Sequence, residues 1–198
     1  MNPVSYGTVQ PFMLWNLYLA AFPVVLASAL FRKPERITAG WCAGFVAWLL
    51  FLPNSPYVLT DVVHMVDEMR TSRSDGHAYA ILATYAVFFT CGLVSYVVSL
   101  QLFRRFLHRV SPPRLILPIL LIVHSLCVVA MYIGRFMRLN SWDVLLAPRT
   151  VLAAVVRVPH PFTLVVLASM FVVVGVGAFV AAALGDKMIA ELRRLRAR

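Results

Sequence analysis

The sequence predicts an all-α integral membrane protein with five transmembrane helices and a short interfacial helix between the fourth and the fifth. Of its 198 residues, 61% are hydrophobic and only 13% are charged, and the mean hydropathy is +0.83. Soluble domains are typically about 45–50% apolar and about 25% charged. The charged residues also gather in short blocks between long apolar runs. We therefore expect a single transmembrane helical domain that covers residues 1–198.

Five apolar runs are candidates for membrane spans, because about 20 helical residues cross the hydrocarbon core. The second run is short: its residues would make about 21 Å of helix, whereas the core is about 30 Å thick. The polar residues that follow this run are therefore expected to lie below the headgroups. The five predicted spans cover about residues 12–31, 39–53, 78–103, 115–133 and 162–184.

The segment between the fourth and fifth spans predicts a short helix from Ser141 to Ala147. Asn140 followed three residues later by Asp143 is typical of a helix N-terminus. The helix is too short to cross a bilayer, and Pro148 follows it, so we expect it to lie in the interface. Aromatic residues such as Trp142 are common anchors at that depth.

The distribution of Lys and Arg predicts the orientation. With the N-terminus outside, twelve of the 18 basic residues lie inside and six outside. The positive-inside rule therefore favours an outer N-terminus and an inner C-terminus, with residues 187–198 as a basic cytoplasmic tail. The net charge of +10 then reflects topology and attraction to anionic lipid in the bilayer. The basic residues do not form a compact face, so we do not expect nucleic acid as a partner.

One polar stretch interrupts the second apolar run, and two prolines break its helix. It reads LFLPNSPYVLTDVVHM and places Asp61 and His64 three residues apart, on one helical face. Such a pair can act in acid–base catalysis or contribute two ligands to a metal ion; the alternative is that both side chains simply cap and pair at a helix end. Asn54, between the prolines, either caps the helix that restarts or binds a ligand.

A second polar stretch, GRFMRLNSWDV, ends the fourth apolar run. Arg135 and Arg138 are spaced to share a helical face, and two guanidinium groups can hold a phosphate or carboxylate. The alternative is that they reach the headgroups or pair with acidic side chains. Asn140 and Trp142 are further candidate ligand-binding residues, and Asp143 is a candidate to orient His64 or an arginine.

The two stretches are expected to lie on the same side of the membrane. Each follows an even-numbered span, so this expectation holds for either orientation of the chain. His124, in the middle of the fourth run, is instead expected to be hydrogen-bonded inside the bundle. The three cysteines share no metal-binding or disulfide spacing. The sequence leaves the cofactor unknown and indicates none strongly.

The two stretches resemble the signature blocks of a bacterial multi-pass membrane protein family catalogued as domain of unknown function 1361. FLPNSPYVLTDVVHM resembles FLPNAPY-x-x-TD-x-x-H, with Ser55 in place of Ala, and IGRFMRLNSWDVLLAP resembles GRF-x-R-x-NSWD. The family brings no known reaction, ligand or partner. The resemblance implies a bacterial cytoplasmic (inner) membrane. It also implies a set of polar signature residues: Asn54, Asp61, His64, Arg135, Arg138, Asn140, Trp142 and Asp143.

Two functions fit these observations, and the sequence does not decide whether the protein is an enzyme. The first is an outward-facing polar site that binds or processes an anionic lipid or a phosphate-bearing envelope precursor. Asp61, His64 and Asp143 would be its catalytic residues, and Asp61 and His64 its candidate metal ligands. The second is a non-catalytic component that assembles with a partner, in which the same polar groups form a structural network.

Overall fold

The protein is described here by a computed structural model that covers residues 9–32, 37–72, 74–157 and 160–196. All regular secondary structure in these residues is helical, and five helical segments are long and apolar enough to cross a membrane. Both findings confirm the predicted fold class. The elements are α1 (Pro11–Phe31), α2 (Ala39–Phe51), α3 (Asn54–Tyr57), the 3₁₀-helix η1 (Val58–Asp61), α4 (Val62–Arg70), α5 (Asp75–Val110), α6 (Pro113–Met137), α7 (Asp143–Leu146), α8 (Pro148–Arg157) and α9 (Pro161–Arg196).

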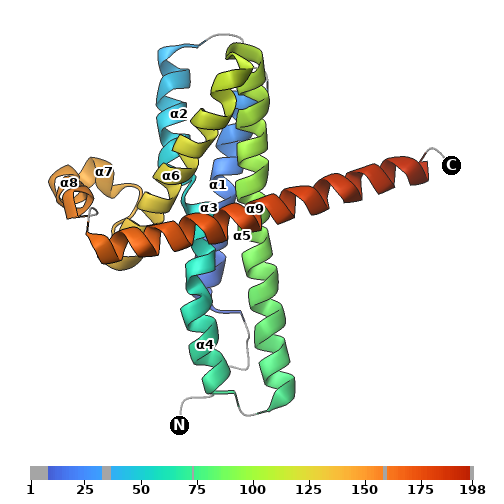
Figure 1. Ribbon diagram of the computed structural model, residues 1–198. Helices are drawn as coiled ribbons and strands as arrows, with labels where there is room; N and C mark the ends of the chain where they lie inside the picture. Colours follow the sequence, from blue (N-terminus) through green and yellow to red (C-terminus); the bar gives the residue numbers. More distant parts are fainter. Residues whose placement is uncertain (1–8, 33–36, 73, 158–159, 197–198) are drawn as a thin grey trace.

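Four of the long helices, α1, α2, α5 and α6, run lengthwise and form the bundle (Figure 1). At one end, the buried ring of Trp48 lies 5.0 Å from that of Phe31 and 4.9 Å from that of Phe103. The indole Nε1 of Trp48 donates to Ser99 Oγ at 3.0 Å, and Ser99 Oγ donates to the Pro23 carbonyl at 3.1 Å. Aromatic packing and one satisfied polar chain thus join α1, α2 and α5.

The second span differs from the prediction. α2 ends at Phe51, but α3, η1 and α4 continue the helical path to Arg70, so the candidate span covers residues 39–70 rather than 39–53. The helical path continues past the two prolines because the backbone N–H groups that follow still find carbonyl acceptors. The Tyr57 N–H, for example, donates to the Pro53 carbonyl at 3.1 Å. In Figure 1, α4 lies beyond the end of α2 and beside the first turns of α5.

Close packing holds this broken segment between α1 and α5. The Ser55 hydroxyl donates to the Ala20 carbonyl of α1 at 2.7 Å. On the other side, a Cβ at Gly92 of α5 would lie 2.2 Å from Val58 Cγ2 and 2.5 Å from the Ser55 carbonyl oxygen. Only glycine lets α5 approach the segment so closely, as small residues do at helix interfaces in membranes.

The fourth span and the short helix after it largely match their predictions. α6 begins two residues earlier than the predicted 115–133 and ends four residues later. The predicted helix from Ser141 to Ala147 exists as the shorter α7, Asp143–Leu146. The residues that follow, to which the sequence assigned no element, make a second short helix, α8.

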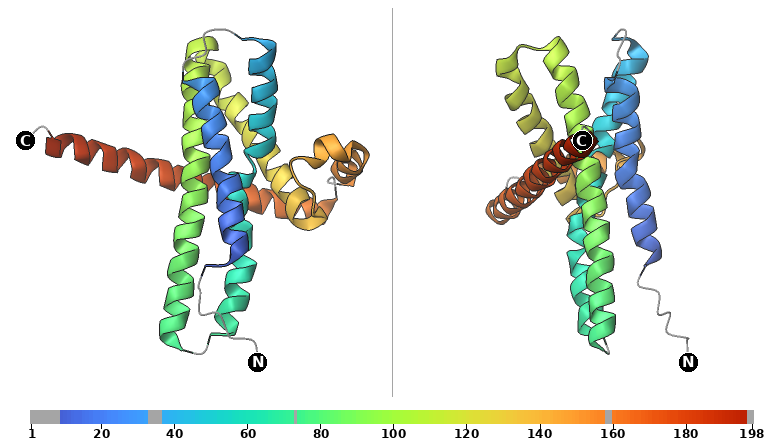
Figure 2. Two further views of the ribbon diagram at one scale, coloured as in Figure 1. Left: turned by 180° about the vertical axis from the view of Figure 1, so that it is seen from behind. Right: turned by 90° about the vertical axis from the view of Figure 1, so that its right-hand side faces the viewer.

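The third and fifth long helices extend beyond their predicted bounds of 78–103 and 162–184. α9 continues to Arg196, so the predicted basic tail at 187–198 is a helical extension of this span as far as it is described. α9 crosses the bundle at a steep angle, as Figure 1 and both views of Figure 2 show. At the crossing, His124 of α6 contacts both neighbouring helices: its Nδ1 lies 2.7 Å from the Tyr96 hydroxyl of α5, and its Nε2 lies 3.1 Å from the Phe171 carbonyl of α9. The expected burial of His124 is confirmed.

Candidate functional site

The site begins where the second span breaks. The Asn54 side-chain N–H donates to the Phe51 carbonyl at 2.9 Å, and Thr60 Oγ1 donates to the Tyr57 carbonyl at 2.8 Å. Nearby side chains thus provide hydrogen-bond donors for backbone carbonyls at the break. A single 3₁₀ turn then ends at Asp61. Because a 3₁₀ turn is tighter than an α-helical turn, it changes the direction in which the following side chains project. Asp61 is thereby directed between α1 and α6.

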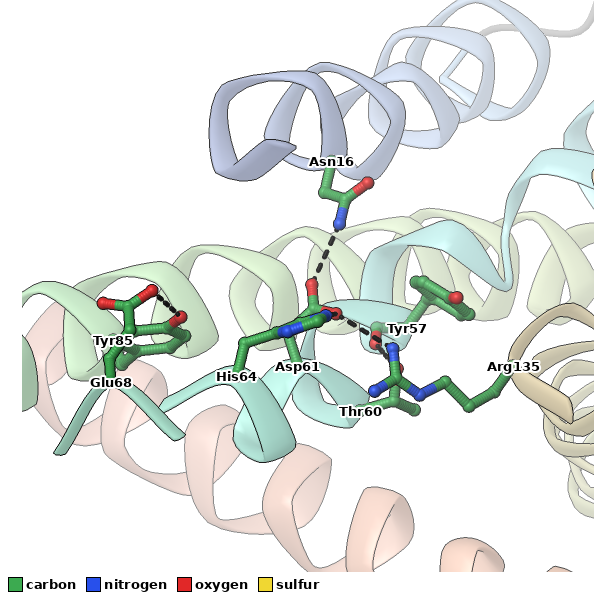
Figure 3. Close-up of polar contacts among 8 residues, drawn as sticks. All are labelled: Asn16, Tyr57, Thr60, Asp61, His64, Glu68, Tyr85 and Arg135. Atoms are coloured by element: carbon green, nitrogen blue, oxygen red, sulfur yellow. Dashed lines mark hydrogen bonds and ion pairs between the residues drawn. The ribbon is translucent and has the colours of Figure 1, made fainter. Parts of the chain in front are cut away.

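Asp61 is the centre of a buried polar cluster (Figure 3). Its side chain is 3% exposed. Asn16 of α1 donates from Nδ2 to Asp61 Oδ2 at 2.9 Å, and a guanidinium nitrogen of Arg135 lies 3.4 Å from Asp61 Oδ1. A buried carboxylate is tolerated when it is paired and hydrogen-bonded, and these two contacts supply both requirements. The cluster ties three elements together: α1, η1 and α6.

His64 lies one turn further along the same face, as its spacing from Asp61 predicts. Its Nε2 is 4.0 Å from Asp61 Oδ1, and its ring centroid is 5.1 Å from that of Phe12. The imidazole is 48% exposed. His64 is therefore an accessible imidazole next to a buried carboxylate, at a distance too long for a hydrogen bond.

The second polar stretch forms an ordered turn at the end of α6. Asn54 Nδ2 donates to Ser141 Oγ at 3.0 Å, which links this turn directly to the proline-broken segment. The Asn140 backbone N–H donates to Asp143 Oδ2 at 2.6 Å. A Cβ on Gly134 would lie 3.4 Å from the Tyr57 ring, so this glycine brings the end of α6 close to the break. The two stretches thus lie in direct contact in the structure.

Two side chains within this turn are arranged differently from what the sequence suggested. α6 ends at Met137, and Arg138 adopts a left-handed backbone conformation with φ of 56°, so Arg135 and Arg138 do not share a helical face. Asp143 caps its own turn through Asn140. Among the described ion pairs, none joins Asp143 to His64 or to an arginine.

A cavity of about 860 Å³ nevertheless collects most of the predicted residues. It lies among α1, the broken second span, α6 and the α7–α8 segment. Trp142 and Asp143 are not among the residues that line it. The predicted residues that do line it are Asn54, Asp61, His64, Arg135, Arg138 and Asn140.

Sequence reasoning missed two polar residues of this site, Asn16 and Ser141, both of which line the cavity. Asn16 is the one amide in the first apolar run, and such an isolated polar side chain in a membrane span is itself a signal. The rest of the wall is mainly apolar and includes Leu19, Leu50 and Val129. The cavity therefore combines a polar end with a hydrocarbon-like wall.

The charges of the cavity favour an anion. Its lining contains one carboxylate, Asp61, and two guanidinium groups, Arg135 and Arg138. Arg135 pairs with Asp61, whereas Arg138 forms no ion pair with any carboxylate that the structure describes. The described residues also contain no group of three His, Cys, Asp or Glu side chains that could hold a metal ion. Asp61 and His64 thus lack a third ligand among them.

Comparison with known protein families identifies the family of this chain. Residues 15–176 match the model of a family described as proteins of unknown function, DUF1361. The chain belongs to the DUF1361 family. The match covers both polar stretches and every residue that lines the cavity except Phe12. No curated protein and no solved structure matches it.

Proposed function

We propose that this DUF1361 protein binds the anionic headgroup of a membrane amphiphile, such as an anionic lipid or a lipid-linked envelope precursor, in the cavity. Arg138 carries the proposal, because its side chain lines the cavity and has no carboxylate partner among the described residues. Its backbone also adopts the left-handed conformation that glycine favours. An arginine at such a position costs stability, which is understandable if its guanidinium has a ligand to bind.

The apolar wall supports an amphiphile over a free anion. A cavity of about 860 Å³ is within the roughly 300–1,000 Å³ range of ligand pockets and much larger than a phosphate group needs. Leu126 and Val155 line it and are also 48% and 45% exposed. The cavity wall thus continues onto the apolar surface, and a lipid could place its headgroup at Arg138 and a chain along this wall.

His64 and Asp61 take different parts in this proposal. Both oxygens of Asp61 are engaged, one by Asn16 and one by Arg135, so Asp61 acts mainly by holding Arg135 in place. His64 is accessible and can donate a proton or a hydrogen bond to a bound headgroup. The 4.0 Å between His64 Nε2 and Asp61 Oδ1 supports binding better than a reaction, because efficient proton transfer needs contacts of about 2.6–3.2 Å.

The proposal places the protein in the inner membrane of a bacterium, with the cavity facing outward. Support comes from the excess of Lys and Arg on the opposite side of the chain. Asn16 lies five residues after the start of α1, which corresponds to about 8 Å along a helix. A polar cluster at that depth is within reach of a lipid headgroup.

The test compares Arg138→Gln with Arg149→Gln in the purified full-length protein. Arg149 is exposed on α8 and does not line the cavity, so it controls for the loss of one positive charge nearby. Native mass spectrometry would measure binding of a polyprenyl monophosphate, of phosphatidylglycerol and of phosphatidylcholine. Losing a charged hydrogen bond of about 1.5–3 kcal/mol should weaken binding of the anionic lipids roughly 10- to 100-fold in Arg138→Gln alone. Equal binding by both variants would refute the proposed site.

A second candidate function, that of a non-catalytic membrane component, is favoured by one observation. Among the described residues, no buried side-chain nitrogen or oxygen lacks a hydrogen-bond partner, so the Asp61 cluster is complete without a ligand. In this case Asp61→Ala should lower stability by about 3 kcal/mol, since it leaves a charge without its partner. The exposed His64→Ala should change it by less than about 0.5 kcal/mol. If both variants unfold like the wild type and lose lipid binding, the structural role is excluded.

A further inference from the structure

A second basic site lies on α5, outside the cavity and near the α5–α6 turn. Gln101, Arg104, Arg105 and His108 line a cleft of about 250 Å³. Their spacing places them on one side of the helix, and the last three are exposed. Among the described side chains, no carboxylate pairs with Arg104 or Arg105.

The neighbouring Arg109, in contrast, has a structural role at this end of the bundle. Arg109 donates to the backbone carbonyls of Phe31 and Arg32 at the end of α1. Arg109 therefore joins α5 to α1 by hydrogen bonds between the two helices. Arg104 and Arg105 form no hydrogen bond with the described residues, so their guanidinium groups remain available to a ligand.

An exposed apolar stripe leads from this cleft along α5. Val98 and Val94 are 36% and 47% exposed and lie three and seven residues before Gln101, on the same side of the helix. The distance from Val94 to Arg105 along the helix is about 16 Å, close to half of the roughly 30 Å hydrocarbon core. The surface thus offers a cationic end and an apolar strip one leaflet long.

We propose that this surface binds one anionic phospholipid, with the phosphate in the cleft at Arg104 and Arg105 and an acyl chain along Val98 and Val94. Two guanidinium groups match a phosphate in charge and in hydrogen-bond geometry. A soluble anion would use the cleft and leave the apolar strip unused. The site is separate from the cavity at Arg138 and does not depend on the function proposed for it.

The test places a fluorophore beside the proposed acyl chain, which distinguishes this site from the cavity. Val98→Cys is labelled with bimane in a full-length protein whose exposed cysteines, Cys42 and Cys91, are replaced by Ala. The protein is reconstituted in phosphatidylcholine vesicles with increasing brominated phosphatidylglycerol or brominated phosphatidylcholine. Quenching then reports which lipid lies next to residue 98.

Phosphatidylglycerol should quench at a lower mole fraction than phosphatidylcholine, by roughly fivefold for each arginine that contributes. Arg104→Gln/Arg105→Gln should abolish this preference. Arg32→Gln/Arg114→Gln removes two exposed charges from the same end of the bundle and should retain it. Equal loss in both double variants would overturn the proposal, because the preference would then be general surface attraction. Full competition by millimolar inorganic phosphate would also overturn it and indicate a soluble anion site.

Discussion

Glycine at position 138 should be more stable than alanine there, and both should weaken the binding of anionic lipid. The backbone at Arg138 has φ of 56° and ψ of 35° at the end of α6. A non-glycine residue in this left-handed region costs roughly 1–2 kcal/mol. Glycine avoids that cost but loses about 0.5–1 kcal/mol in chain entropy on folding. The net gain of glycine over alanine is therefore about 0.5–1 kcal/mol, or an increase of about 1–4 °C in melting temperature for a chain of this size.

Arg138→Ala is the control that isolates the backbone contribution. Alanine removes the guanidinium and its favourable interaction with the helix C-terminus, as glycine does, but it retains the Cβ that opposes a positive φ. Both variants should lose binding of a polyprenyl monophosphate to the same degree. Only Arg138→Gly should melt above Arg138→Ala, as measured by thermal unfolding of the detergent-solubilised protein.

Two outcomes would refute this reasoning. If the glycine variant melts at or below the alanine variant, the left-handed conformation carries no cost, and the argument that Arg138 is retained for its side chain fails. If the glycine variant is more stable but binds the lipid as well as the wild type, the cavity does not use Arg138. The lipid-binding proposal would then lose its main support.

Two further variants test the packing that positions the site, again by thermal unfolding in detergent. Gly92→Ala should destabilise the protein by about 1–3 kcal/mol or more, because the new Cβ would overlap Val58 and the backbone of the broken segment. Gly76→Ala, where a Cβ meets nothing within 4 Å, should be neutral or stabilising by up to about 1 kcal/mol; similar melting of the two would contradict the close contact. Ser99→Ala should cost about 1–3 kcal/mol because it leaves the buried Trp48 indole N–H without its acceptor, and an unchanged melting temperature would show that this bond contributes little.

The sequence was sufficient to predict that the two polar stretches meet. Helix parity places the ends of the second and fourth spans on one side, and the structure brings Asp61 to 3.4 Å from Arg135. The spacing of Asp61 and His64 also predicted their shared orientation. These predictions succeed because they depend on chain alternation and helical periodicity, which any tertiary packing of these spans must respect.

Other features depend on tertiary contacts that no local pattern encodes. Asn16 lies 45 residues before Asp61 in the chain, so no spacing rule links them, although they share a hydrogen bond. The i, i+3 argument for Arg135 and Arg138 assumed that the helix continues, whereas α6 ends between them. Hydropathy identified α9 as a span, but its direction across the bundle depends on tertiary contacts such as that of His124 with Phe171.

The geometry assigns the two arginines of the cavity different tasks. An anion that displaced Asp61 from Arg135 would leave a carboxylate with 3% exposure without its charge partner, and breaking a buried pair in this way costs about 3–5 kcal/mol. Binding at Arg138 carries no such penalty, because Arg138 has no described carboxylate to release. A headgroup should therefore bind Arg138 first and meet Arg135 only through its free nitrogens. Consequently, Arg135 variants should fail mainly through lost stability, and Arg138 variants through lost binding.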